Sequence, residues 1–403
     1  MSVEFLNLRH LRAFMEVADA HGISAAAHKV HLSQPAVTQA ISGLEARLGT
    51  KLLDRRTEGM FPTKAGGALL ARVRRMFGHL AHGAALAVRI GRREGKPVPD
   101  FHLRVTAAQL RALIAIRDAG NFSLAARTLG ISQPSIHRAG RDLEKLSGME
   151  LFSAGRRGIE LTPQAEAFAR SVKLAEAELN QGLDDLTRLA GRDSTRITVG
   201  SMPLSRTRIL PEAIDALLAG SAGVQIRTID APYAELLRGL RYGDIDVLIG
   251  ALRDPVPVDD VVQEPLFEDR LSVVAGPNHP LAGRRNIGIS DTLAYPWIPP
   301  PKETPGGSYL FRTLQIGDMQ ETPVRIVSSS MVLVRGLLAR GDYLTILSPH
   351  QAEVEIAHGD MVQLDMDLPD SRRPIGLTTR TGWVPTATQA RFLDLIRAAA
   401  TRR

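Results

Sequence analysis

The chain has 403 residues and no cysteine, which excludes disulfides, thiolate metal sites and a cysteine nucleophile. Its start lacks a signal-peptide pattern and no run of about 18 apolar residues follows, so we expect a cytoplasmic protein without membrane contact. The net charge of +7 is uneven: residues 1–99 carry 15 Lys and Arg against 7 Asp and Glu, residues 100–193 carry 13 against 12, and residues 194–403 carry 22 against 24. We expect the basic surplus to face a polyanion, and the alternative is a solvated basic surface.

A long internal repeat is the most informative feature of the sequence. Leu8–Thr63 returns without a gap as Ala107–Thr162, at an offset of 99 residues, and 18 of the 56 aligned positions are identical. Many shared positions fall in two clusters, which in the first copy consist of Ser24, Ala26, Ala27, Ser33, Gln34, Pro35, Leu44 and Glu45. A repeat of this length indicates a duplicated folding unit.

The first copy predicts three helices. Apolar spacing over residues 11–18 indicates an amphipathic helix, and Ser24 is a suitable N-cap for a second helix over residues 25–30. Ser33 is a suitable cap for a third, longer helix, in which Pro35 is tolerated because it lies in the first turn. The outer face of this third helix is polar and consists of Gln34, Thr38, Gln39 and Ser42.

This arrangement suits DNA. A helix, a short turn and a second helix with a polar outer face fit the major groove, where Gln pairs with adenine and Thr contacts thymine. Residues 52–63 predict a two-stranded wing, in which Arg55 and Arg56 are placed to contact backbone phosphates. The alternative is a helix-turn-helix that serves only for packing.

The unit resembles the winged helix-turn-helix of LysR-type transcriptional regulators over its whole length, from Leu11 to Gly66, including the run Ser33-Gln34-Pro35-Ala36-Val37-Thr38-Gln39. The resemblance implies that Gln34, Pro35, Thr38 and Gln39 approach bases and that Arg55 contacts the backbone. The candidate DNA-binding residues of the first copy are Ser33, Gln34, Pro35, Thr38, Gln39, Ser42, Arg55 and Arg56.

The second copy departs from this pattern. It keeps the motif residues Gln and Pro, but Ala154 stands where the first copy has Arg55, and its charge is close to neutral. Its candidate DNA-binding residues are Gln133, Pro134, His137, Arg138 and Arg141. Two interpretations stay open, namely direct DNA contact and a structural pseudo-subunit.

A heptad pattern follows each copy. Apolar and small residues alternate by four and three, and the pattern recurs 99 residues later with its glycine, as Gly83 and Gly182, which predicts two long linker helices. We hypothesise that the helices pair antiparallel within one chain, so that the chain is a pseudo-dimer. Pairing between chains is the alternative.

From residue 194 onward, strands alternate with helices, which predicts a parallel sheet. The region resembles the effector-binding part of the same family, which is similar to type 2 periplasmic binding proteins and has two lobes. One of the cues is the run Gly243-Asp244-Ile245-Asp246-Val247. We expect lobe I over residues 196–262 and 365–403, and lobe II over residues 263–364.

Ligands of open α/β sheets bind at the carboxyl ends of strands and at helix N-termini. Hydroxyl and backbone N–H groups at these positions suit a small polar or anionic metabolite. Several candidate residues have a structural alternative. Arg206 either pairs with a carboxylate of the ligand or is an exposed helix arginine. Tyr233 either contacts the ligand or packs at the sheet edge, and Ser328 and Ser329 either bind the ligand or cap a helix. The candidate effector-binding residues are Ser201, Met202, Leu204, Ser205, Arg206, Tyr233, Gly250, Ala251, Pro299, Lys302, Ser328 and Ser329.

The predicted fold is multidomain, with two all-α winged helix-turn-helix units on long linker helices, followed by an α/β two-lobe domain similar to periplasmic binding proteins. The expected ranges are 1–66 and 106–165 for the units, 67–95 and 166–193 for the linker helices, 96–105 for the connector and 194–403 for the effector domain.

We expect a sequence-specific regulator that binds double-stranded DNA and a small metabolite and self-associates as a homodimer or homotetramer, with RNA polymerase as a candidate partner. We expect no cofactor, metal or enzymatic activity, because no nucleophile elbow, phosphate loop or metal-ligand spacing is present. The alternatives are an enzyme acting in the two-lobe cleft, an architectural DNA-binding protein, and a metabolite-binding protein whose second helix-turn-helix is purely structural.

Overall fold

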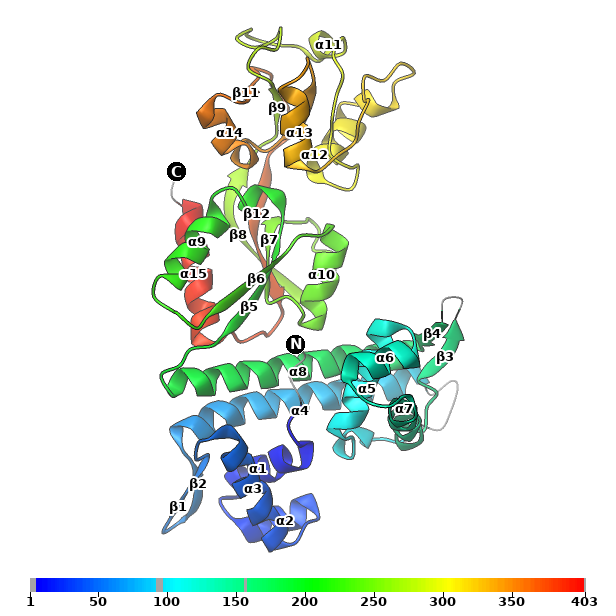
Figure 1. Ribbon diagram of the computed structural model, residues 1–403, viewed down its shortest axis with the longest axis vertical. Coiled ribbons are helices and arrows are strands. Elements are labelled where there is room, and N and C mark those ends of the chain that lie inside the picture. The colour runs from blue at the N-terminus through cyan, green and yellow to red at the C-terminus, as the bar shows by residue number, and fades with distance from the viewer. Residues whose placement is uncertain (1–4, 92–96, 156–157, 402–403) are drawn as a thin grey trace.

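The computed structural model describes residues 5–91, 97–155 and 158–401. Two small helical units are held by a pair of long helices, α4 (Lys64–Gly91) and α8 (Pro163–Leu189), and the two lobes of the α/β region are stacked on this pair (Figure 1). None of the described helices is long and apolar enough to span a membrane.

The first unit contains the three helices and the wing that its sequence predicts. Its elements are α1 (Leu8–Ala20), α2 (Ile23–Val30), α3 (Gln34–Leu48), β1 (Leu53–Arg56) and β2 (Gly59–Pro62). The Ser33 hydroxyl accepts a hydrogen bond from the Ala36 N–H, so α3 begins directly after this cap. The predicted cap of α2 is wrong, because the helix begins at Ile23 after Gly22 and Ser24 therefore lies inside it.

The second unit repeats the first element by element. It consists of α5 (Ala107–Ala119), α6 (Phe122–Leu129), α7 (Gln133–Ser147), β3 (Phe152–Gly155) and β4 (Gly158–Leu161). The same pair of hydrogen bonds fixes the start of each wing. The carboxylate of Glu45 accepts two backbone N–H bonds at 2.8 and 3.2 Å. The carboxylate of Glu144 accepts the equivalent bonds at 2.9 and 3.2 Å. The duplication therefore preserves the hydrogen-bonded framework of the unit.

The two long helices run antiparallel and pack against each other within the chain. Gly83 of α4 faces Ser171 of α8, and Gly182 of α8 faces Arg72 of α4. Since Gly182 and Ser171 are the 99-residue counterparts of Gly83 and Arg72, the two contacts are related by an internal pseudo-twofold axis. Residues 92–95 of the first expected linker helix lie outside the described residues.

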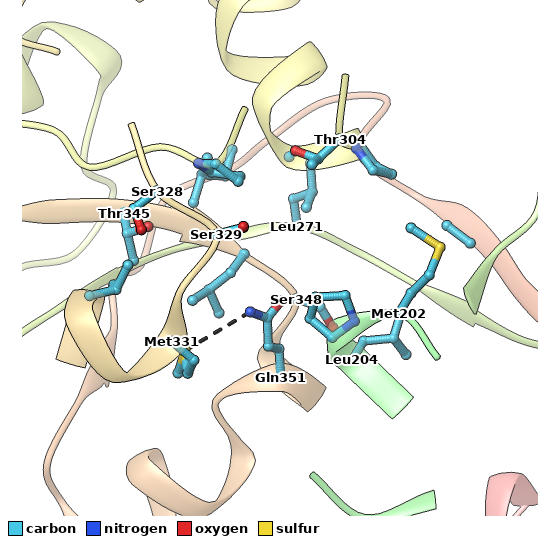
Figure 2. Close-up of a pocket in the computed structure, with 18 of the residues that line it drawn as sticks. Met202, Leu204, Leu271, Thr304, Ser328, Ser329, Met331, Thr345, Ser348 and Gln351 are labelled. Atoms are coloured by element: carbon cyan, nitrogen blue, oxygen red, sulfur yellow. Dashed lines mark hydrogen bonds between the residues drawn. The ribbon is translucent and has the colours of Figure 1, made fainter. Parts of the chain in front are cut away.

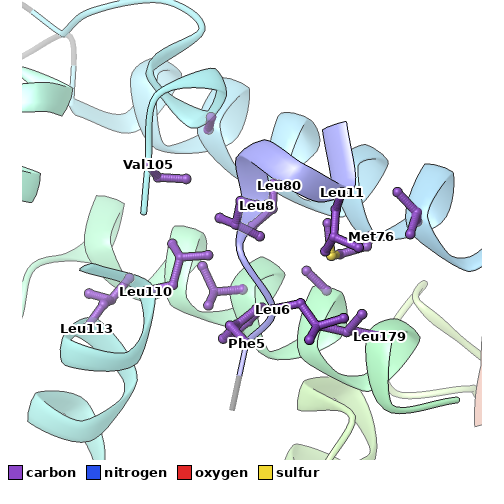
Figure 3. Packing of buried hydrophobic residues seen from close by; sticks show 14 of the residues in the cluster. Phe5, Leu6, Leu8, Leu11, Met76, Leu80, Val105, Leu110, Leu113 and Leu179 are labelled. Carbon is purple, nitrogen blue, oxygen red and sulfur yellow. The ribbon is translucent and has the colours of Figure 1, made fainter. Parts of the chain in front are cut away.

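One hydrophobic core runs through both units and the helix pair. Figure 3 shows Phe5 and Leu6 of the N-terminal segment beside Leu110 of α5 and Leu179 of α8, so side chains of the first copy pack on the second. Burial of each large apolar side chain stabilises the fold by about 1.5–3 kcal/mol. The shared core therefore holds the two units in a fixed mutual orientation.

The connector between the copies contributes to this core. It contains the 3₁₀ turn η1 (Phe101–Leu103), and the Phe101 ring lies 4.8 Å from the ring of Phe168 in α8, in an edge-on arrangement. Such an aromatic pair anchors the connector against the start of the second long helix.

Lobe I is built on a five-stranded sheet with the strand order β6-β5-β7-β12-β8. Its elements are β5 (Arg196–Ser201), η2 (Pro203–Ser205), α9 (Ile209–Leu218), β6 (Gln225–Ile229), α10 (Tyr233–Tyr242), β7 (Val247–Ala251), β8 (Val261–Asp269), β12 (Arg373–Arg380) and α15 (Ala387–Thr401). β5, β6 and β7 are parallel, as predicted, whereas β12 is antiparallel to both β7 and β8. The sheet is therefore mixed, and β8 and β12 are the strands that connect the lobes.

Lobe II contains a three-stranded antiparallel sheet with the order β10-β9-β11. Its elements are β9 (Ser272–Ala275), α11 (Ile289–Thr292), α12 (Pro305–Ser308), η3 (Tyr309–Thr313), η4 (Ile316–Asp318), α13 (Met331–Leu338), β10 (Leu344–Leu347), η5 (Pro349–Gln351), α14 (Glu353–His358) and β11 (Val362–Gln363).

The expected lobe boundaries require a correction. β8 continues the lobe I sheet to Asp269, so a boundary between residues 262 and 263 cuts through a strand. Leu364 and Leu368 pack in the lobe II core, so lobe I does not resume at residue 365 but with β12. A crossing strand belongs to the sheet of one lobe and leads directly into the other lobe. Because the amino-acid composition does not change along it, the sequence does not mark the lobe boundary.

Lobe I rests on the helix pair through a buried polar network. The Arg72 side chain of α4 is 6% exposed and pairs with Glu178 and Asp185 of α8 at 3.1 and 3.2 Å. It also donates to the Val384 carbonyl, beyond β12, at 2.8 Å. Because a buried charge is costly without its partners, this network ties lobe I to both long helices.

Candidate DNA-reading faces and effector cavity

The outer face of α3 is polar and points away from the core of the first unit. The buried inner face consists of Val37, Ala40, Ile41 and Leu44. The exposed side consists of Gln34, Pro35, Thr38, Gln39 and Ser42. The Thr38 hydroxyl donates to the Gln34 carbonyl at 3.0 Å, which leaves its methyl group and lone pairs for a ligand. Ser33 is exposed too, but its hydroxyl is used as the helix cap.

The wing of the first unit carries two exposed guanidinium groups. β1 and β2 pair with Arg55 opposite Met60, and both Arg55 and Arg56 are exposed. The Arg56 guanidinium lies 5.2 Å from the centre of the Phe61 ring, which orients it along the wing. Both cations are therefore accessible on the surface of the wing, beside the exposed face of α3.

The outer face of α7 is exposed as well, but its chemistry is different. It consists of Gln133, Pro134, His137, Arg138 and Arg141. The His137 ring lies 5.0 Å from the Phe122 ring, and Arg141 pairs with Glu144 at 2.8 Å. Arg138 makes no ion pair or side-chain hydrogen bond to the residues that the structure describes. The second unit therefore presents cationic donors where the first presents amide and hydroxyl groups.

A cavity of about 90 Å³ lies between the two lobes. Lobe I lines it at the ends of β5 and β7, and lobe II lines it with α12, the start of α13 and the end of β10. Figure 2 shows Met202 and Leu204 across the cavity from Ser328, Ser329 and Met331. Its walls are largely apolar, with hydroxyl groups at the lobe II side.

Five of the twelve expected effector residues line this cavity, and they are Met202, Leu204, Ala251, Ser328 and Ser329. Ser328 and Ser329 precede α13, and the Ser328 hydroxyl accepts a hydrogen bond from the Ser330 N–H at 3.1 Å. They thus lie at the positive end of an eight-residue helix, a position that favours negative charge.

The expectation is corrected for the polar and charged residues Arg206, Ser201, Ser205 and Lys302, which do not line the cavity. The Arg206 guanidinium pairs with Asp230 and binds the hydroxyl and carbonyl of Ser201. Ser205 donates to the Met202 carbonyl at 2.8 Å, and Lys302 pairs with Asp318 at 3.2 Å. All four stabilise loops, because a local partner satisfies each polar group.

Three further expected residues, Tyr233, Gly250 and Pro299, also lie outside the cavity lining. The Tyr233 ring stacks under the Arg253 guanidinium at 4.4 Å. Gly250 makes room for a wall of the cavity, because a Cβ there would lie 2.5 Å from the Met202 sulfur. The Pro299 carbonyl accepts the Ser328 N–H at 3.0 Å and so positions the serine loop.

Arg373, which the sequence reasoning missed, is the strongest candidate for ligand binding among the residues that line the cavity. Its side chain is 16% exposed, and its Nη2 donates to Asp269 at 2.9 Å. Nε and Nη1 are buried and have no hydrogen-bond partner in the part of the chain that the structure describes. Burial lowers the pKa of Arg373, the Asp269 carboxylate opposes this, and the Arg253 charge adds to it. A buried guanidinium with two donors left over after its ion pair with Asp269 suits a carboxylate or similar anion.

Asp269 connects this arginine to lobe II. Its Oδ1 accepts a hydrogen bond from the Ser348 hydroxyl at 2.9 Å and lies 3.0 Å from His350 Nδ1. Arg373 and Asp269 are also paired across β12 and β8, the two crossing strands. Arg373, the candidate anion-binding group of the cavity, therefore lies where the crossing strands join the two lobes. Among the described residues, no cluster of His, Asp or Glu could hold a metal ion.

Comparisons with known proteins agree with this architecture. Residues 8–67 and 107–166 both match the family described as bacterial regulatory helix-turn-helix protein, lysR family, and residues 190–401 match the LysR substrate binding domain. The HTH-type transcriptional regulator GalR of Pseudomonas putida is 31% identical over 403 residues, which is 100% of both chains. The HTH-type transcriptional regulator PcaQ of Agrobacterium fabrum is 27% identical over 298 residues, 74% of this chain and 96% of that protein.

Among solved structures, full-length OxyR from Pseudomonas aeruginosa is similar with a TM-score of 0.53 at 21% identity, over 74% of this chain and 100% of that one. The predicted fold class is thus confirmed, and the relatives are named as regulators rather than enzymes. The chain is a DNA-binding transcriptional regulator with an effector-binding domain, and it belongs to the LysR family.

Proposed function

We propose that one chain of this regulator reads both half-sites of an operator, each with one helix-turn-helix unit. The contacts of Gly83 with Ser171 and of Gly182 with Arg72 support this arrangement, because they close the linker seam within the chain. The exposure of the outer faces of both α3 and α7 supports it further.

In the first unit, the outer face of α3 contacts the bases and the wing contacts the DNA backbone. Gln34 and Gln39 offer amides for adenine, and Thr38 and Ser42 offer hydroxyl groups. Ser33 and Pro35 shape the start of the helix. Arg55 and Arg56 contact phosphates, which adds affinity without sequence information. In the second unit, the equivalent face is the set Gln133, Pro134, His137, Arg138 and Arg141.

The effector is a small anion with an apolar body, and a carboxylate fits best. One observation above all supports this assignment: Arg373 lines the inter-lobe cavity, and two of its N–H donors have no hydrogen-bond partner among the described residues. The apolar walls formed by Met202, Leu204 and Met331 suit the body of such a molecule, and the hydroxyl groups of Ser328 and Ser329 suit its polar substituents.

Binding of the effector reaches the DNA-binding units through rigid contacts. Arg373 and Asp269 lie on the strands that join the lobes, so an anion bound there favours one lobe arrangement over another. Lobe I is in turn fixed to the helix pair by Arg72 and to the second unit by Arg117, whose guanidinium lies 4.0 Å from the centre of the Tyr242 ring. A change in lobe orientation therefore strains the junction with α8.

The effector assignment is tested by calorimetric titration of the full chain with aromatic and short aliphatic carboxylates and with their amides. We expect the acids to bind and the amides to fail. Arg373→Lys keeps the charge but loses the two unpartnered guanidinium donors, and it should weaken carboxylate binding at least tenfold, while Arg206→Lys, outside the cavity, should not. Equal binding of acids and amides, or an unaffected R373K, would contradict the assignment.

We further propose self-association, as a homodimer or homotetramer, through a surface other than the linker seam, because α8 already fills that seam. Val332 and Leu333 on α13 are 72% and 47% exposed and offer one such surface. Val332→Asp should then lower the association state measured by sedimentation. RNA polymerase is the proposed partner at the promoter, and crosslinking on promoter DNA would test that contact.

A further inference from the structure

The two recognition helices occupy equivalent positions in a duplicated framework. α3 and α7 each have 15 residues, each follows a serine cap, and each ends at a glycine. The same glutamate bonds fix both wings. Residues 38, 39 and 42 of the first helix therefore correspond in space to residues 137, 138 and 141 of the second.

The three corresponding positions carry unlike chemistry. The first helix has Thr38, Gln39 and Ser42, which are neutral and combine donors with acceptors. Glutamine pairs best with adenine, and the threonine methyl group packs on that of thymine. The first face therefore favours A·T pairs.

The second helix has only basic side chains at these positions. Arg138 is exposed and has no partner among the described residues, and an arginine of this kind binds the O6 and N7 atoms of guanine through two hydrogen bonds. His137 is held against Phe122 at 5.0 Å, and Phe122 is itself packed edge-on at 5.9 Å against Phe152. Since Arg141 is paired with Glu144, Arg138 is the main reader of the second face.

The strands of the two wings differ in the opposite sense, because here the first unit carries the arginines. Arg55 and Arg56 of β1 correspond to Ala154 and Gly155 of β3. Among the described residues, strand β1 therefore carries two guanidinium groups that contact phosphates, whereas strand β3 carries none and Arg138 lies on the recognition helix, where it reaches base edges. In the first unit, arginines therefore add affinity for any DNA sequence, whereas in the second unit an arginine contributes to the choice of sequence.

We propose that the operator is directional, with two unlike half-sites: an A·T-rich half-site for the first unit and a half-site with a G·C pair, read by Arg138, for the second. This rests on the proposed function, in which both units contact DNA. A dimer of identical subunits reads a palindrome because its halves are identical. These two helices are joined in one chain and differ at the three positions 38, 39 and 42 and their counterparts 137, 138 and 141.

The test begins with selection of binding sites for the full chain from random duplexes. The selected site is then compared with two palindromes, each made from one of its half-sites. We expect the asymmetric site to bind at least about tenfold more tightly than either palindrome, since one mismatched pair has an effect of this size. A guanine in the second half-site should be protected from methylation at N7.

A graft then assigns the preference to residues. The triple variant His137→Thr, Arg138→Gln and Arg141→Ser copies the first face onto the second helix, and all three positions are exposed. It should prefer the palindrome of the first half-site. The double variant Arg285→Gln and Arg312→Gln, which removes two exposed charges from lobe II, controls for net charge and should keep the asymmetric preference.

The possible failures are distinct. If the wild-type chain shows no sequence preference, the proposed function itself is wrong. If it prefers the palindrome of the first half-site, or if the graft leaves the preference unchanged, both units still bind DNA but the directional operator is wrong. Protection of a single half-site would show that the second unit does not read bases, which also overturns the inference.

Discussion

Addition of one methyl group at the seam between the long helices tests the internal pseudo-dimer directly. In Gly83→Ala the new Cβ would lie 2.3 Å from the Ser171 Cβ. Neither atom can rotate away, because each is fixed to its helix backbone, so the helices must separate. In Gly182→Ala, the pseudo-symmetric control, the Cβ would lie 3.1 Å from the Arg72 Cβ. A shift of a few tenths of an ångström is enough there.

The expected free energies follow from these distances. Alanine stabilises a helix by about 1 kcal/mol relative to glycine, and overpacking of a filled core destabilises by about 1–3 kcal/mol. At Gly83 the clash is severe, so we expect a net loss of about 2 kcal/mol. At Gly182 the two effects nearly cancel or leave a small gain. Removal of the opposing methylene by Ser171→Gly should rescue Gly83→Ala, with a coupling free energy of about 1–2 kcal/mol.

The measurement is native-state hydrogen exchange of peptides from α4 and α8 in the full chain, which reports local opening free energies. Urea unfolding of each variant accompanies it. Equal effects of the two substitutions, or no rescue by Ser171→Gly, would refute the close approach at Gly83. If the loss in Gly83→Ala depended on protein concentration, the helices would pair between chains rather than within one.

Three further predictions concern charged residues. Arg55→Ala should weaken binding to all DNA sequences alike and reduce the slope of log K against log salt by about 0.9, measured by fluorescence anisotropy. Arg72→Met leaves the buried Glu178 with one cation fewer and should destabilise the chain by about 3–5 kcal/mol in urea unfolding. Burial raises the pKa of Asp184 to about 7 from an ordinary 3.8, so its contribution to stability is complete below pH 4 and is lost as the pH rises towards 7. Asp184→Asn should therefore be more stable than the wild type at pH 8, by up to a few kcal/mol, and equally stable near pH 4, as measured by thermal unfolding at both pH values.

Because of the repeat, the two helix-turn-helix units could be predicted from the sequence. Helices α3 and α7 and both wings lie where the local pattern placed them, because caps, apolar spacing and turns are short-range signals. Ser24 is the instructive error: a good capping residue lies one position inside α2, since Gly22 already provides the extended backbone that precedes the helix. Local preference was overridden there by the turn.

The cavity was harder to anticipate. Met202 and Ser328 lie on short loops after strands or before a helix, where general rules place ligands. Arg373 carries no such mark, because it begins a crossing strand near the end of the chain and its importance comes from Asp269, 104 residues earlier. Arg206 was a candidate because it is a cation close to the end of β5, but it forms an ion pair with Asp230 instead.

The amino-acid order alone predicted that a helix-turn-helix unit occurs twice, which faces of its helices are polar, and that strands alternate with helices from residue 194 onward. These properties depend on periodicity and on neighbours within a few turns, whereas the two lobes were predicted from the resemblance to the LysR family. Only the folded chain decided that Gly83 meets Ser171 of the same molecule, that the lobes part at Asp269, and that Arg373, with two buried donors left over, lines the space between them. Those outcomes arise from contacts between segments far apart in the chain, where shape and burial rather than local preference select the partner.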